Sequence, residues 1–231
     1  MNPIPLLTIS ISQVAEKDCY NIPMRSYAFI DASNLFYGGE KSLGWKIDYK
    51  KLLAYLQDKY DVSKAFYFGG VELHNFKYDY QRQDTVPIRT LERHLADLLK
   101  KKPETLTDAE AVLIGRHLQR ARFYRKLGEF GYTLFLKPVK SYAQEDGSTR
   151  RKANCDVEMT FRLMKEQEDF DRAVILSGDG DFLPVLKHLK DNRKQVIVLS
   201  RGPRTAKEIR QFAGSNFRDF EYLQTRISAD K

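Results

Sequence analysis

Short apolar runs alternate with helix-like segments along most of this 231-residue chain. Residues 27–30, 173–176 and 195–199 are the most apolar runs, and residues 47–60 repeat leucine at helical spacing. Strands that alternate with helices form right-handed βαβ units, whose parallel sheet is covered on both faces. We therefore predict an α/β fold, a three-layer α/β/α sandwich with a mainly parallel sheet of about five to six strands.

The remaining elements follow from the same periodicities. Strands are predicted at residues 62–71, 132–136 and 217–222, and helices at 108–127, 154–168, 182–192 and 205–212. Gly128 is the predicted end of the long helix, and Asn154 is the predicted N-cap of the helix that follows. A polar, basic segment at residues 140–152 interrupts the alternation.

We expect one domain over residues 25–223, with a helical insertion around residues 73–102. Residues 1–24 are interpreted as a weakly ordered N-terminal extension or as a misassigned start, with Met24 as the true initiator. Residues 224–231 are interpreted as a C-terminal tail.

Net charge, the length of the apolar runs and the cysteine count indicate which binding partners and which location to expect. The net charge of +8 favours polyanions, nucleic acid first. No run reaches the roughly 20 apolar residues that span a bilayer, so no membrane partner is expected. The two cysteines form neither a zinc pattern nor a disulfide framework, which makes a reducing cytoplasm the expected location. Four histidines are scattered without ligand spacing and are expected on the surface or on helix faces.

Carboxylates follow two of the apolar runs directly. Asp31 ends the first run, and Asp179 and Asp181 follow the run at 173–176 in the segment Ser-Gly-Asp-Gly-Asp-Phe. Asp156 lies in the first turn of a predicted helix. Ligands bind at the carboxyl edge of parallel strands, so these side chains are expected to meet there if the first and fourth strands are neighbours.

A ring of carboxylates can hold one or two Mg²⁺ or Mn²⁺ ions, which take hard oxygen ligands and assist phosphodiester hydrolysis. Each acid also has an ordinary structural interpretation. Asp156 would complement a helix dipole, Asp179 or Asp181 would cap a helix, and Asp31 would form an Asx turn.

Five further residues are candidates for substrate binding. Arg150, Arg151 and Lys152 would offset the surplus negative charge of the acids toward a phosphate. Asn34 and Ser177 could hydrogen-bond a phosphate or orient a carboxylate, or could instead cap helices.

Three motifs resemble the NYN domain family, a branch of the PIN-like metal-dependent nucleases. They are residues 29–35 (FIDASNL), 152–158 (KANCDVE) and 174–182 (VILSGDGDF), with Pro184 and the next strand following the last motif. The resemblance covers roughly residues 27–222.

The resemblance implies a Mg²⁺- or Mn²⁺-dependent endoribonuclease whose catalytic and metal-binding acids are Asp31, Asp156, Asp179 and Asp181. It implies RNA, single-stranded or structured, as the partner, and a homo-oligomer is compatible with it. Family members often carry another Asp in the helix that follows the second motif. Here residues 160–164 of that helix read TFRLM, so the number of bound metal ions, one or two, remains open.

The sequence leaves two alternative functions open. One is a non-catalytic RNA-binding or regulatory module with the same fold. The other is a phosphatase of the haloacid dehalogenase type, which needs a second Asp two residues after the first-strand Asp. That position is Ser33, which argues against the phosphatase.

Overall fold

The computed structural model describes residues 24–36, 41–101, 106–143 and 149–229. Apart from Met24, the predicted N-terminal extension lies outside these described residues. Six strands form the main sheet in the order β3-β2-β1-β6-β7-β8, and every neighbouring pair is parallel. They are β1 (Ser26–Asp31), β2 (Val62–Val71), β3 (Thr133–Pro138), β6 (Arg172–Leu176), β7 (Gln195–Ser200) and β8 (Phe217–Asp219).

Helices cover both faces of this sheet, because its central strands are apolar on both sides. In β1, Ala28 and Ile30 pack in one core cluster, whereas Tyr27 and Phe29 pack in the other. The first cluster lies under α2 (Tyr49–Tyr60), α4 (Asp108–Phe130) and α8 (Gln224–Ile227). The second lies under α5 (Asp156–Lys165), α6 (Leu183–Asp191) and α7 (Lys207–Ala213). The predicted three-layer sandwich is therefore confirmed.

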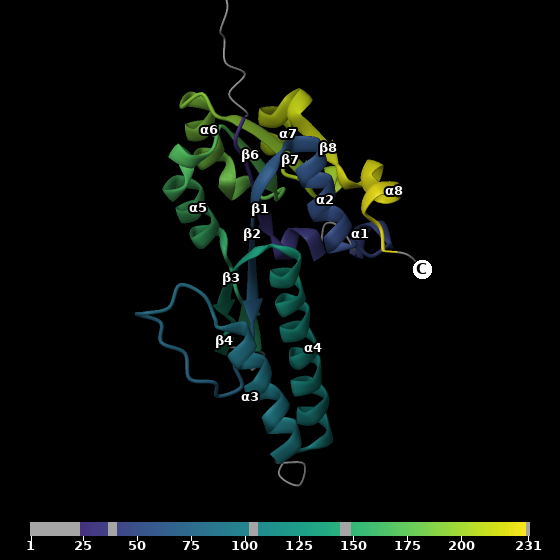
Figure 1. The fold of residues 1–231 in the computed structure, drawn as a ribbon, viewed down its shortest axis with the longest axis vertical. Coiled ribbons are helices and arrows are strands. Elements are labelled where there is room, and N and C mark those ends of the chain that lie inside the picture. The colour runs from purple at the N-terminus through teal and green to yellow at the C-terminus, as the bar shows by residue number, and fades with distance from the viewer. Residues whose placement is uncertain (1–23, 37–40, 102–105, 144–148, 230–231) are drawn as a thin grey trace, which may run out of the picture.

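The helices α3 (Ile88–Lys101) and α4 form a long hairpin that extends well beyond the sheet (Figure 1). Leu91 and Leu95 of α3 are buried in the first core cluster. Glu92 of α3 accepts a hydrogen bond from the Arg125 Nε of α4 at 2.8 Å, which ties the two helices together.

Some predicted helix ends are wrong. The helix α4 continues past Gly128 to Phe130 and ends at Gly131, whose φ of 110° is the left-handed conformation that glycine adopts without strain. The N-cap of α5 is Cys155 rather than Asn154, although the Asn154 Oδ1 accepts a hydrogen bond from the Asp156 N–H at 2.8 Å.

The segment between β3 and α5 and the segment that ends the chain also differ from the prediction. The polar segment contains an antiparallel hairpin of β4 (Lys140–Ala143) and β5 (Thr149–Lys152), which was not predicted. The last strand ends at Asp219, three residues earlier than expected. Beyond it, α8 packs beside α2, and Ile227 is fully buried. A short helix, α1 (Lys41–Leu43), precedes α2.

Candidate metal centre and its cleft

The strand order places the acidic motifs side by side. The strand β1 pairs with β6 on one side and with β2 on the other, so Asp31 and the segment after β6 reach the same edge of the sheet. The first and fourth predicted strands are therefore neighbours, which is the condition under which the acids were expected to meet. The N-terminus of α5 brings Asp156 to this edge from the second helical layer.

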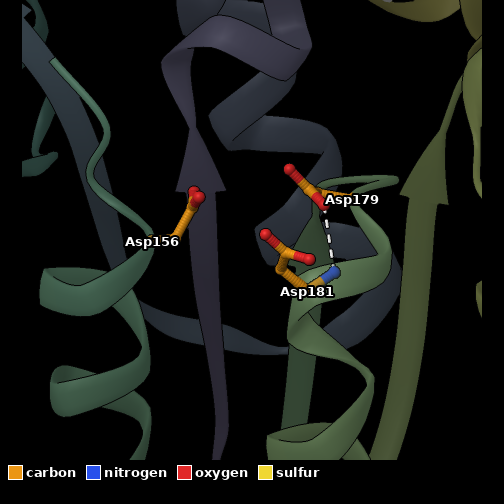
Figure 2. Close-up of side chains that lie close together, drawn as sticks. All are labelled: Asp156, Asp179 and Asp181. Carbon is orange, nitrogen blue, oxygen red and sulfur yellow. Dashed lines mark hydrogen bonds between the residues drawn. The ribbon is translucent and has the colours of Figure 1, made fainter. Parts of the chain in front are cut away.

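Three of the predicted ligands form one cluster. Asp156, Asp179 and Asp181 each offer an oxygen, and these oxygens lie within 4.8 Å of one another. Figure 2 shows the three side chains converging from the start of α5 and from the loop after β6. Among the side chains that the structure describes, no lysine or arginine forms an ion pair with any of these three carboxylates.

Tight backbone packing holds the loop that carries two of these acids. The Asp179 carboxylate accepts a hydrogen bond from the Asp181 N–H at 3.0 Å and so caps the short helical turn at Gly180–Phe182. A Cβ on Gly178 would lie 2.7 Å from both the Ser200 and the Thr205 hydroxyl oxygens. Only glycine fits there, because the loop lies directly against the segment that follows β7.

Asp31 stands beside the cluster and is joined to it by hydrogen bonds. Its Oδ1 accepts from the Ser33 N–H at 2.9 Å and from the Ser33 hydroxyl at 2.7 Å. The buried Ser177 hydroxyl donates to Asp31 Oδ2 at 3.4 Å and accepts from the Asp179 N–H at 3.3 Å. Ser177 therefore links the two acidic motifs.

When no cation is present, the electrostatics of the site raise the pKa of two acids, Asp31 and Asp156. Burial raises the pKa of Asp31, although hydrogen bonds from Ser33 and Ser177 oppose that rise. Burial also raises the pKa of Asp156, and the negative charges of Asp31, Asp179 and Asp181 raise it further. A divalent cation would relieve this repulsion, and the all-oxygen donor set suits Mg²⁺ or Mn²⁺.

The other predicted substrate-binding residues lie nearby or outside the described side chains. Asn34 accepts a hydrogen bond from the Ser200 hydroxyl at 3.0 Å, which joins the segment after β1 to the end of β7. Arg150, Arg151 and Lys152 form β5 through their backbone, and their side chains are outside the described part of the structure.

The acids open onto a cleft of about 1070 Å³ that also has a basic wall. Arg116 and Arg120 of α4 line it, together with Lys46. Sequence reasoning missed all three, because their positions carry no motif and α4 was read only for its apolar periodicity. The four-residue spacing of Arg116 and Arg120, which puts both on one face of a helix, was the available signal.

The structure also groups three histidines that the sequence shows as scattered. His74 and His117 are hydrogen-bonded through their ring nitrogens, and their ring centroids are 4.7 Å apart. The Nε2 of His94 contacts the His74 carbonyl oxygen at 2.8 Å. These histidines meet because residues after β2, on α3 and on α4 come together in the hairpin, and His94 and His117 lie on helices as predicted.

An all-parallel α/β/α sandwich with carboxylates gathered at the carboxyl edge of its strands has the architecture of the PIN-like nuclease class. The family comparison agrees, since the model of the NYN domain matches residues 25–221. The chain therefore belongs to the NYN domain family, as the three sequence motifs indicated.

Individual relatives are distant. The chain is 25% identical over 192 residues to the low amplitude and bright protein LabA of Synechococcus elongatus, covering 81% of this chain and 80% of that protein. Its structure is similar to that of VPA0982, a Vibrio parahaemolyticus protein of unknown function, with a TM-score of 0.53 and 19% identity. That match covers 89% of this chain and 97% of the other.

A weaker structural match is the T5 D15 protein co-crystallised with metal ions, with a TM-score of 0.39 and 14% identity. It covers 81% of this chain and 59% of that one, and it is too distant to support an argument. Separately, none of the helices in the described ranges is long and apolar enough to cross a bilayer.

Proposed function

We propose that this protein is a metal-dependent endoribonuclease that hydrolyses RNA phosphodiester bonds with the help of Mg²⁺ or Mn²⁺. The observation that carries the proposal is the cluster of Asp156, Asp179 and Asp181, whose oxygens lie within 4.8 Å of one another. Three carboxylates at this distance repel each other strongly, and a divalent cation is the simplest partner that would stabilise them.

Each acid has a proposed role. Asp156, Asp179 and Asp181 hold the cation, and Asp31 completes the set from the end of β1. A bound divalent cation would supply charge stabilisation for the phosphate in the transition state and would ease deprotonation of water. Asp31 is suited to accept a proton from the attacking water, because it stands beside the other three acids and is held in place by hydrogen bonds from Ser33 and Ser177.

The hydroxyl and amide residues have positioning roles in this proposal. Ser177 is buried and hydrogen-bonded to Asp31, so it orients that carboxylate. Asn34 is linked to Ser200 and steadies the segment that follows Asp31. Arg150, Arg151 and Lys152 remain proposed phosphate ligands on the β4–β5 hairpin. A cytoplasmic location also remains part of the proposal.

The proposal predicts that Asp179→Asn abolishes RNA cleavage while preserving the fold. Asparagine keeps the oxygen that accepts from the Asp181 N–H and removes only the charge. We expect a rate loss of at least about 100-fold, equivalent to ~2.7 kcal/mol of barrier height. The measurement is cleavage of a labelled single-stranded RNA in Mn²⁺ or Mg²⁺, with chelator as the metal-free arm.

The matched control is Asp58→Asn, which removes the same charge from an exposed position on α2. Cleavage that is insensitive to chelator and to Asp179→Asn would refute the metal site. RNA binding with no cleavage under any of these conditions would favour the non-catalytic module. The phosphatase alternative is disfavoured, because Ser33 donates to Asp31 where that mechanism needs a second carboxylate.

A further inference from the structure

The helix α4 presents one face to the same cleft as the acids. Arg116, Gln119, Arg120 and Phe123 all line it. They are spaced i, i+3, i+4 and i+7, which places them in one row along a helix. Phe123 also contacts the ring of Tyr49, with centroids 5.0 Å apart, and both rings belong to the cleft wall.

The basic residues of α4 divide into two groups by their partners. On the side that faces α3, Arg122 and Arg125 form ion pairs with Glu92, and Lys126 pairs with Glu129. On the cleft side, Arg116 and Arg120 are exposed and form no ion pair with any residue of the described ranges. The charges that face the cleft are therefore available to an external anion.

The acids opposite this row create a problem for any polyanionic substrate. Asp156, Asp179 and Asp181 repel phosphates on either side of the one that a bound cation would engage. Binding then depends on cations elsewhere on the cleft wall. Guanidinium groups suit this task, because they stay charged and donate in a fork that matches phosphate oxygens.

We propose that the α4 row binds the sugar-phosphate backbone of a single-stranded nucleic acid segment that flanks the cleaved phosphate. This inference rests on the proposed function for the identity of the substrate. Arg116 and Arg120 contact phosphates, and Phe123 and Tyr49 offer aromatic surface to an unpaired base. Arginines interleaved with aromatic side chains in a groove are the typical arrangement for single strands.

The test uses the double variant Arg116→Ala/Arg120→Ala, placed on the Asp179→Asn background so that the probe stays intact. Binding of a fluorescent 12-nucleotide single-stranded RNA is followed by anisotropy at several salt concentrations. We expect affinity to fall about tenfold or more and the slope of log K against log[salt] to shrink by about 1.4, since each single-strand phosphate contact contributes about 0.7.

The charge-matched control is Arg122→Ala/Lys126→Ala on the same background, which removes two positive charges from residues of α4 that do not line the cleft. It is expected to change affinity less than about threefold, and circular dichroism confirms that both double variants are folded. An equal loss in the control, an unchanged slope in the cleft variant, or tighter binding of a duplex of the same sequence would overturn the inference.

The binding experiment can fail or succeed independently of the cleavage experiment that tests the proposed function. Binding that depends on Arg116 and Arg120 without any cleavage by the unmodified protein leaves the α4 row standing and removes the nuclease. Normal metal-dependent cleavage with binding unchanged by the double variant removes the α4 row alone.

Discussion

At the residue scale, the acids serve the backbone and the candidate site together. Asp31 accepts from the Ser33 N–H, which is an Asx turn, and Asp179 caps the turn that begins at Gly180. The structural interpretations of these two residues are therefore correct as geometry, and they do not compete with a metal site. A carboxylate has about four lone-pair sites, so the one hydrogen bond that Asp179 accepts leaves ample capacity for a cation, whereas Asp31, which accepts three, retains less.

The raised pKa of Asp156 predicts opposite effects of Asp156→Asn with and without metal. Burial and neighbouring acids favour its neutral form in the folded protein. In chelator at pH 7, Asp156→Asn should melt a few degrees higher than the unmodified protein, because the variant lacks a disfavoured charge. In excess Mn²⁺ the order should reverse, because the unmodified protein gains binding energy in its folded state.

The pH dependence follows with a definite sign. A carboxyl whose folded pKa lies above its unfolded value stabilises the fold at low pH and loses that contribution as pH rises through the folded pKa. The advantage of Asp156→Asn in chelator should therefore vanish as pH falls from the raised pKa of Asp156 toward 3.8. Scanning calorimetry from pH 7 to pH 4 measures it, and a constant difference would contradict the prediction.

Gly178 predicts a steric effect on the acidic loop. A Cβ there would lie 2.9 Å from the Thr205 Cα, which is backbone and cannot rotate away. We expect Gly178→Ala to lower the free energy of unfolding by about 1–3 kcal/mol and to weaken Mn²⁺ binding. Gly115→Ala on α4 is the control, because nothing lies within 4 Å of its Cβ, and it should stabilise by roughly 0.5–1 kcal/mol. Urea titration measures the change in the free energy of unfolding for both variants.

At the element scale, elements with strong apolar runs were predictable and polar ones were not. The predicted bounds of β2 match those observed, Val62–Val71, because the run Ala65 to Phe68 is apolar on both faces. The β4–β5 hairpin was not predicted, because residues 140–152 lack the alternation of a half-buried strand. Its pairing joins Lys140 to Lys152, a contact that no local pattern encodes.

The long helix shows how periodicity can identify an element and still misplace its faces. Val112 belongs to the apolar residues of this helix, yet it is 56% exposed. Phe123 is partly buried against the first core cluster and also lines the cleft. The residues that α4 buries are Ile114, Leu118, Ala121, Tyr124 and Leu127. The spacing of Arg116 and Arg120 in the α4 row was visible in the sequence, but its meaning depends on which side of α4 faces the acids.

Ile227 predicts that the C-terminal segment supports the domain. Its side chain is fully buried in the first core cluster, so Ile227→Ala should cost about 2–5 kcal/mol. Tyr222→Ala is the control, since Tyr222 is 82% exposed and its loss should stay within about 0.5 kcal/mol. Equal denaturation midpoints for the two variants would show that residues 224–231 act as a dispensable tail.

At the scale of the whole molecule, the parallel sheet and its two-faced core were predictable in outline, because alternating strands and helices form parallel strands covered on both faces. The strand order was not predicted, and the pairing of β1 with β6 entered only as the condition for the acids to meet. The opposing walls of the cleft were not predictable. They arise where the α3–α4 hairpin, a long excursion between β2 and β3, folds back beside the edge that carries the acids.

The chain order of the sheet has a consequence for biosynthesis. The loop of Asp179 and Asp181 is held by Ser200 and by the Ala206 N–H, which donates to the Gly178 carbonyl oxygen at 2.9 Å. A nascent polypeptide still on the ribosome therefore lacks a completed acid cluster until β7 and the start of α7 have emerged. If the cluster cleaves RNA, a nascent chain acquires that activity only after β7 and the start of α7 have folded onto the acidic loop.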